Sequence, residues 1–278
     1  MARAVSFAHS PDPDDAFMAW ALATGRVADP AVAVSVAARD IATLNQEALA
    51  GAGPDVSALS AATFLRVAER YTLLRHGASF GEGYGPIVVA RAGAPVDWKG
   101  LVAIPGPSTT AAVALALAKP GLRTVTRPFD AILDAVRDQE ADLGLVIHEG
   151  QLTFAKEGLA KVLDLGAWWR DETGLPLPLG VVAAKRALGD ALAPASRVLK
   201  ASIEAGLAHR ADALRHARSF GRGLDREETD RFVAMYVNAR TLDMGDDGLE
   251  ALRAFARRAA EAGLLPTGAD RFSVEPRD

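Results

Sequence analysis

Short apolar runs that alternate with amphipathic helical segments dominate the first half of this sequence. The runs 4–8, 32–36 and 56–59 each lead into a segment whose apolar residues recur at helical spacing. Strands and helices that alternate in this way predict an α/β protein with a mostly parallel sheet. The chain has 278 residues, which exceeds the usual size of one compact domain and predicts two lobes.

Two segments rich in glycine and proline interrupt the alternation and are candidates for crossings between the lobes. They are residues 77–85 and residues 166–179, and the chain after the second is predicted to be mostly helical. We expect residues 1–91 and 180–278 to form the first lobe, and residues 92–179 to form the inserted second lobe. This layout resembles the type II periplasmic-binding-protein architecture, which binds ligands in a cleft between its lobes.

Composition argues against several classes of function. The 31 basic and 35 acidic side chains are interspersed and give a net charge of −4, so no basic stripe is available for nucleic acid. The sequence has no cysteine, which removes disulfides, thiolate metal sites and a cysteine nucleophile. Neither a secretory signal nor an apolar run of membrane-spanning length is found. We therefore expect a cytoplasmic protein that binds a small anionic molecule, without nucleic acid, membrane or metal; its oligomeric state is not predicted.

The first strand ends in an acidic loop that runs from Ser10 to Asp15. Its prolines constrain the turn, and Asp14 or Asp15 can cap the helix that follows. A capped helix with solvated carboxylates is therefore one interpretation of this loop. Calcium binding is a weaker one, because the glycine and the later glutamate of an EF-hand are lacking.

A later strand, 101–104, leads directly into a helix whose first amides and positive dipole end favour a carboxylate. The hydroxyls of Ser108, Thr109 and Thr110 would add hydrogen-bond donors. Ala111 would let a ligand approach the backbone closely. In the simpler interpretation, Ser108 or Thr109 only caps the helix, and both interpretations can hold together.

His148 follows the buried strand 143–147 and is the candidate catalytic residue. An unperturbed histidine titrates near pH 6.5, so a histidine at a cleft wall can accept a proton at cellular pH. Such a general base contributes about 10² to 10⁴ in rate. The alternative is a structural histidine that is hydrogen-bonded to the backbone.

Several longer stretches of the chain are similar to the 1,4-dihydroxy-6-naphthoate synthases, enzymes of the futalosine pathway to menaquinone. The matching stretches follow in order along almost the whole chain: SPDPDDAFMAWAL, TLNQEAL, SALSAATF, GYGPIVVAR, PGPSTTA, LGLVIHEG, LTFAKEGL, DLGAWWRDETGLPLPLG and MYVNARTLDMG. The resemblance implies a cytoplasmic lyase that cleaves cyclic dehypoxanthine futalosine to the dihydroxynaphthoate, with no metal or organic cofactor.

The resemblance also implies roles for particular residues. His148 would take a proton from a sugar hydroxyl and start a carbon–carbon cleavage that ends in an aromatic ring. Thr110 and Ala111 would lie at the start of the substrate-binding helix. The residues that would line the opposite lobe are Ala58, Leu59 and Ser60.

Two departures from the family pattern bear on the substrate. Asp12 and Asp14 stand where the family usually has cysteine and asparagine, and Gly150 stands where it usually has serine. If the two aspartates face the cleft, their charges would repel an anionic substrate. Two other functions stay open: a related chorismate dehydratase, which also binds an anionic ring, and a solute-binding protein for a small carboxylate, which needs no general base.

Overall fold

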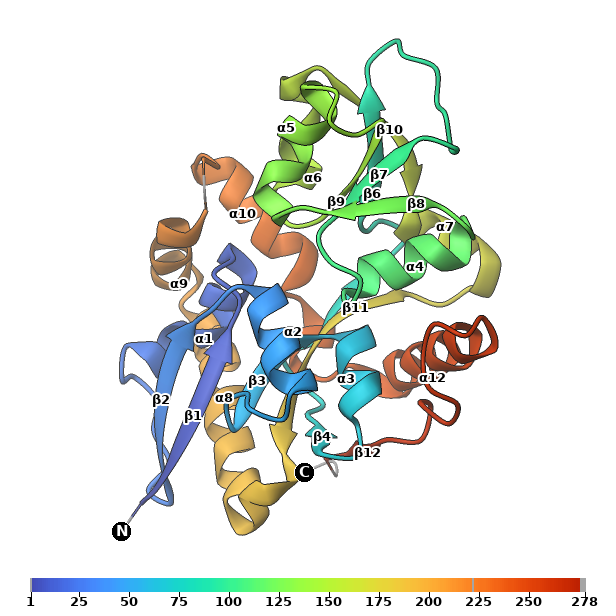
Figure 1. Ribbon diagram of the computed structural model, residues 1–278. Helices are drawn as coiled ribbons and strands as arrows, with labels where there is room; N and C mark the ends of the chain where they lie inside the picture. The colour runs from blue at the N-terminus through green and yellow to red at the C-terminus, as the bar shows by residue number, and fades with distance from the viewer. Residues whose placement is uncertain (1, 222, 276–278) are drawn as a thin grey trace.

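Two β-sheets form the framework of the computed structural model, which describes residues 2–221 and 223–275 (Figure 1). The larger sheet has the order β12-β4-β11-β3-β1-β2, with β5 paired to β11. Its strands are β1 Arg3–His9, β2 Val32–Ala38, β3 Val56–Ser60, β4 Tyr71–Leu73, β5 Ser79–Gly81, β11 Leu177–Lys185 and β12 Ser273–Val274. The smaller sheet has the order β10-β6-β9-β7-β8. Its strands are β6 Ile87–Arg91, β7 Leu101–Ile104, β8 Arg123–Thr126, β9 Leu143–Val146 and β10 Leu159–Asp164. The prediction of a two-lobed α/β protein is confirmed.

Helices surround each sheet. Those of the larger sheet are α1 Pro13–Ala23, α2 Ile41–Leu49, α3 Ala61–Val67, α8 Leu192–Ala208, α9 Arg210–Ala217, α10 Arg226–Tyr236, α11 Ala239–Leu242 and α12 Gly245–Glu261. The segment of the smaller sheet contributes α4 Thr110–Ala118, α5 Ile132–Arg137, α6 Gly150–Thr153 and α7 Leu165–Thr173. Among the residues that the structure describes, no helix combines the length and the apolar character needed to cross a membrane.

Strand β11 shows how the larger sheet is buried on both faces. Val182 and Ala184 pack in the apolar cluster that includes residues of α1 and α8, whereas Val181 and Ala183 pack in the cluster on the α3 and α12 side. Successive side chains of a strand point to opposite faces, so a continuous apolar run marks a strand that is covered on both.

The prediction of a mostly parallel sheet is wrong for the strands that cross between the lobes. Strand β1 is parallel to β2 and β3, and β7 is parallel to β8 and β9. In contrast, β6 is antiparallel to β9 and β10, and β11 is antiparallel to β3, β4 and β5. The two strands that carry the chain between the lobes, β6 and β11, therefore run antiparallel to the neighbouring strands that belong to βα units.

The first predicted boundary between the lobes also needs correction. Residues 87–91 were expected in the first lobe, but β6 pairs with β9 and β10 of the smaller sheet, so the chain crosses between Gly81 and Ile87. The return crossing ends at Leu177, three residues before the predicted position 180. Proline is rare inside sheets, so Pro178 argued against a strand that begins before residue 180. In the structure Pro178 lies at a shift in the register between β11 and β5, where a proline is tolerated.

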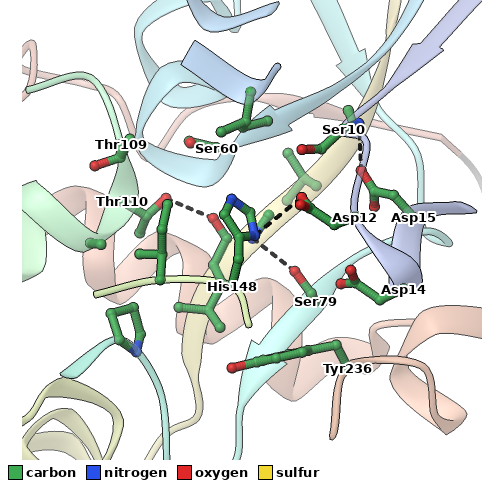
Figure 2. A pocket seen from close by; sticks show the side chains of 18 of the residues that line it. Ser10, Asp12, Asp14, Asp15, Ser60, Ser79, Thr109, Thr110, His148 and Tyr236 are labelled. Carbon is green, nitrogen blue, oxygen red and sulfur yellow. Dashed lines mark hydrogen bonds and ion pairs between the residues drawn. The ribbon is translucent and has the colours of Figure 1, made fainter. Parts of the chain in front are cut away.

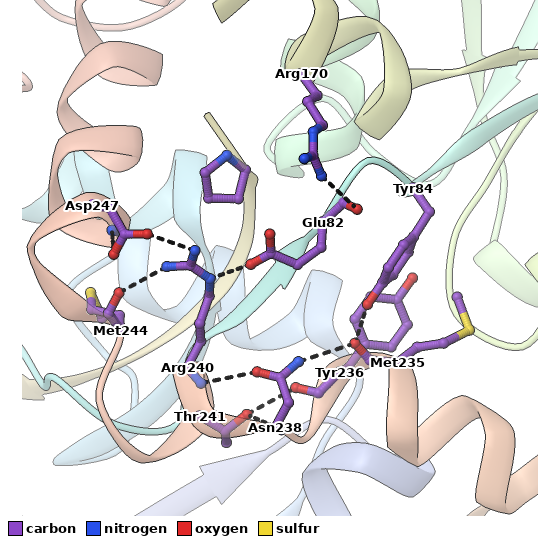
Figure 3. Close-up of polar contacts among 12 residues, drawn as sticks. Glu82, Tyr84, Arg170, Met235, Tyr236, Asn238, Arg240, Thr241, Met244 and Asp247 are labelled. Atoms are coloured by element: carbon purple, nitrogen blue, oxygen red, sulfur yellow. Dashed lines mark hydrogen bonds and ion pairs between the residues drawn. The ribbon is translucent and has the colours of Figure 1, made fainter. Parts of the chain in front are cut away.

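Polar contacts tie the first crossing segment to the C-terminal helices (Figure 3). The guanidinium of Arg240 bonds to the carboxylate of Glu82 in the crossing and to Asp247 of α12, the latter at 2.6 Å. The Tyr84 hydroxyl donates to the carbonyl of Met235 at the end of α10. The crossing is thereby attached directly to α10, through Met235, and to α11, which contains Arg240.

One apolar cluster extends across both sheets, and Trp169 of α7 lies within it. The Trp169 ring is fully buried and meets Phe255 of α12 edge-on, with ring centroids 5.5 Å apart. Its indole N–H donates to the Pro176 carbonyl at 3.1 Å. The two lobes therefore share packed apolar surface in addition to the crossings.

Candidate active site

A cavity of about 750 Å³, its open mouth included, lies between the two sheets. Seven of the eight predicted site residues line it: Ala58, Leu59, Ser60, Thr109, Thr110, Ala111 and His148 (Figure 2). Ser108 is not among the lining residues; its carbonyl accepts a hydrogen bond from the Thr63 hydroxyl at 2.9 Å.

The turn after β9 carries His148 into this cavity. The residue has a φ of 54°, in the left-handed region that non-glycine residues rarely adopt and that is often associated with functional sites. Its ring nitrogen Nδ1 lies 3.1 Å from Oδ2 of Asp12, and the ring meets the Phe129 ring edge-on at 4.8 Å. Nitrogen Nε2 is buried and has no hydrogen-bond partner among the described residues. A buried nitrogen without a partner is unfavourable unless a ligand supplies one.

Glycine at position 150 has a packing reason. A Cβ atom at Gly150 would lie 2.6 Å from Cγ1 of Val146, closer than two carbon atoms approach without a shift. The serine that the family usually has here would need a displacement of Val146, so this departure follows from local packing.

The hydroxyls at the start of α4 are engaged within the protein, contrary to the expectation that they add donors for a ligand. The Thr109 hydroxyl donates to the Gly106 carbonyl at 2.9 Å and accepts from the Ala112 amide at 3.2 Å, so Thr109 is the helix cap. The Thr110 hydroxyl donates to the Leu179 carbonyl at 2.7 Å.

Thr110 also receives a hydrogen bond from the Ala62 amide at 3.1 Å, which joins α4 to the start of α3. What remains for a ligand at this end of α4 is the pair of amides of Thr110 and Ala111, which have no acceptor within the helix. Amides that have no acceptor within the helix, together with the positive end of the helix dipole, suit a carboxylate.

Ser60 offers one hydroxyl donor on the opposite wall. Asn45 holds Ser60 in place: its side-chain amide donates to the Ser60 hydroxyl oxygen at 2.9 Å and its carbonyl oxygen accepts from the Ser60 amide at 3.0 Å. Because the Ser60 hydroxyl accepts in this contact, its own proton can be donated into the cavity.

Comparison with known proteins places the chain in a family. Residues 5–261 match the family model described as menaquinone biosynthesis. A 1,4-dihydroxy-6-naphthoate synthase of Thermus thermophilus is 42% identical over 262 residues, with 94% of each chain covered. One of Streptomyces coelicolor is 38% identical over 277 residues, with 95% of this chain and 96% of the relative covered. The chain belongs to the menaquinone biosynthesis family. The resemblance predicted from the sequence is thus confirmed, and the chain is an enzyme of this family.

Solved structures agree with the fold. A crystal structure of a protein from Archaeoglobus fulgidus superposes with a TM-score of 0.89 at 40% identity and covers 94% of this chain and 98% of its own. The periplasmic aliphatic sulphonate-binding protein of Escherichia coli has a TM-score of 0.68 at 14% identity, with coverage of 100% and 96%. The second likeness concerns the fold alone, and it confirms the periplasmic-binding-protein architecture of this member of the menaquinone biosynthesis family.

Some residues that line the cavity of this family member were not among the site residues predicted from the sequence. The side chain of Tyr236 in α10 donates its hydroxyl proton to Oε1 of Gln151 at 3.1 Å, and both residues line the cavity. Ser79 and Phe232 line it as well. Of these residues, only Tyr236 lies in a stretch that matches the family. The others belong to separate elements, so no motif of adjacent residues indicates that they meet at one cavity.

The acidic loop faces the cavity: Asp12, Asp14 and Asp15 all line it, and no lysine or arginine does so among the described residues. Asp14 and Asp15 do not cap α1 as predicted; instead Asp15 accepts from the Ser10 amide at 2.8 Å. Burial, followed by the charge of Asp12, raises the pKa of Asp15 to about 7. Burial, followed by the charges of Asp15 and Asp12, raises the pKa of Asp14 well above its usual range. At neutral pH the loop therefore carries less negative charge than its sequence suggests.

These raised pKa values predict that part of the stability is lost as pH rises from about 4 to about 7. Unfolded Asp15 releases its proton near pH 4, but folded Asp15 keeps it up to about pH 7, so the folded state binds more protons in between. The contribution of Asp15 to the free energy of unfolding therefore decreases as the pH rises from about 4 to about 7. Asp15→Asn keeps an oxygen that can accept from the Ser10 amide and should flatten the profile, measured by urea denaturation at pH 5 and pH 8.

The matched control for this experiment is Asp134→Asn on α5, whose side chain is 59% exposed. It should leave the difference between pH 5 and pH 8 as in the unaltered protein. An Asp15→Asn profile that retains the full difference would contradict the assignment to Asp15.

Proposed function

We propose that the chain is a carbon–carbon lyase that converts cyclic dehypoxanthine futalosine to 1,4-dihydroxy-6-naphthoate, with His148 as the general base. The observation that carries the proposal is the ring of His148 at the cavity wall, whose Nε2 is buried and has no partner among the described residues. Two relatives at 42% and 38% identity, both named 1,4-dihydroxy-6-naphthoate synthase, support the choice of product. We further propose the cytoplasm as its location.

The proposed reaction begins when Nε2 of His148 takes the proton of a sugar hydroxyl. The resulting alkoxide collapses to a carbonyl as the adjacent carbon–carbon bond breaks, and the sugar-derived fragment leaves with that carbonyl. The electron pair of the broken bond passes into the ring system, which becomes aromatic as its oxyanion takes back the proton from His148. Aromatisation supplies driving force for the cleavage. General-base assistance of this kind contributes about 10² to 10⁴ in rate.

The carboxylate of the substrate would bind at the start of α4, against the amides of Thr110 and Ala111. Ala58, Leu59 and Ser60 would line the opposite wall, with the Ser60 hydroxyl as a donor. The charge of Asp12 and Asp14, which was expected to repel an anion, is reduced because burial keeps the pKa of Asp14 raised. The acidic loop is thus compatible with an anionic substrate at neutral pH.

The test is incubation of the purified protein with cyclic dehypoxanthine futalosine, followed by mass spectrometry. We expect 1,4-dihydroxy-6-naphthoate to form and the substrate to disappear at the same rate. Parallel incubation with chorismate serves as the control for the related dehydratase, whose product is lighter by one water. Substrate that binds but is recovered unchanged would contradict the proposal and favour a binding function.

A further inference from the structure

The contact between Asp12 and His148 joins the two lobes at the cavity wall. Asp12 lies in the loop after β1 of the larger sheet, and His148 lies in the turn after β9 of the smaller sheet. The side chain of Asp12 is 3% exposed and that of His148 is 18% exposed. Because both side chains are mostly buried, little water competes for this 3.1 Å contact. The carboxylate therefore interacts with the imidazole more strongly than it would in an ion pair on the surface.

We infer that Asp12 is the positioning residue of His148: its carboxylate keeps a proton on Nδ1 and thereby leaves the lone pair of Nε2 for the substrate. The inference rests on the proposed function, in which Nε2 is the base. A neutral imidazole has one N–H donor and one acceptor nitrogen, and an ionised carboxylate only accepts. The nitrogen that faces Asp12 is therefore the protonated one.

Asp12 also fixes the orientation of the ring. The Phe129 ring, 4.8 Å away and edge-on, restricts the imidazole plane but does not distinguish its two flipped positions. A flip would replace Nδ1 by a carbon atom opposite Oδ2 of Asp12 and would lose the 3.1 Å contact. The carboxylate therefore selects the position in which Nε2 is available.

A second effect arises during the reaction. When Nε2 of His148 takes the substrate proton, the ring becomes a cation beside the Asp12 carboxylate. In a buried site this pairing stabilises the charge that develops in the transition state. Asp15 does not provide this partner, because its Oδ2 accepts from the Ser10 amide.

The tautomer of His148 is the direct test, and it requires no turnover. Nitrogen-15 NMR of histidine-labelled protein distinguishes the Nδ1–H from the Nε2–H form, and the spectrum of His148→Gln assigns the signals. We expect Nδ1–H in the unaltered protein, recorded without ligand and with 1,4-dihydroxy-6-naphthoate. In Asp12→Asn the amide can donate or accept, so the Nε2–H form should become populated.

Kinetics give the second readout. Asp12→Asn should lower kcat about 10²-fold with KM within about threefold, since Asp12 acts through a base that contributes about 10² to 10⁴. In a His148→Gln background the same change should have no further effect on kcat, because the residue through which it acts is gone. Asp134→Asn, exposed on α5, is the matched control and should behave as the unaltered protein.

Each outcome decides the role of Asp12. An Nε2–H tautomer in both spectra of the unaltered protein would overturn it, as would additive losses of kcat in the double variant. If cyclic dehypoxanthine futalosine is not converted at all, the proposed function fails, and the tautomer still decides whether Asp12 positions His148.

Discussion

Replacing His148 by glutamine should lower kcat by about 10²- to 10⁴-fold and leave KM within about tenfold. Glutamine is close to histidine in size and keeps polar atoms in the cavity, but it cannot accept a proton at neutral pH. The loss therefore falls on the transition state, where proton transfer occurs, and only weakly on substrate binding. Steady-state kinetics with cyclic dehypoxanthine futalosine measure both constants.

The matched control is His209→Gln. His209 is exposed at the junction of α8 and α9 and is not among the residues that line the cavity. It should retain the kcat of the unaltered protein. If His148→Gln turned over substrate at a comparable rate, His148 could not be the base, and a structural histidine would be the correct interpretation.

Replacing Trp169 by alanine should lower the free energy of unfolding by about 3–5 kcal/mol, the usual range for a buried large aromatic residue. The ring is fully buried in the apolar cluster that the two sheets share, and it contacts Phe255 of α12. Alanine would leave a cavity there and the Pro176 carbonyl without the indole donor. Urea denaturation, followed by circular dichroism, measures the change.

Trp168→Ala is the matched control, since Trp168 is the preceding residue on α7 and is only partly buried. We expect it to lose less than half as much stability as Trp169→Ala. Equal losses for the two variants would contradict the assignment of Trp169 to the shared core.

Much of the architecture was predictable because it depends on local patterns. The apolar runs near Val5, Val56 and Leu143 became strands, and the helical spacing of Phe17 and Met18 became α1. His148 could be placed at the cavity for the same reason. The carboxyl ends of parallel strands meet at one edge of a sheet, and a polar residue just after such a strand lies there.

Other features depended on contacts between distant residues. The strand 87–91 has the same apolar character whichever sheet it joins, and only its pairing with β9 and β10 assigns it to the smaller one. The hydroxyls of Thr109 and Thr110 look free in the sequence, yet both are engaged within the protein. Nothing near Asp12 in the sequence signals that its carboxylate meets an imidazole 136 positions away.

By itself the sequence determined the α/β class, the helix start that suits a carboxylate, the family and the histidine that follows β9. These follow from periodicity, from the geometry of a helix end and from motifs of adjacent residues. Only the tertiary structure decided which way the acidic loop faces, how burial shifts the pKa values of its carboxyl groups and which nitrogen of His148 faces Asp12. Those properties depend on burial and on charges brought together from separate strands, and neither is encoded by neighbours in the chain.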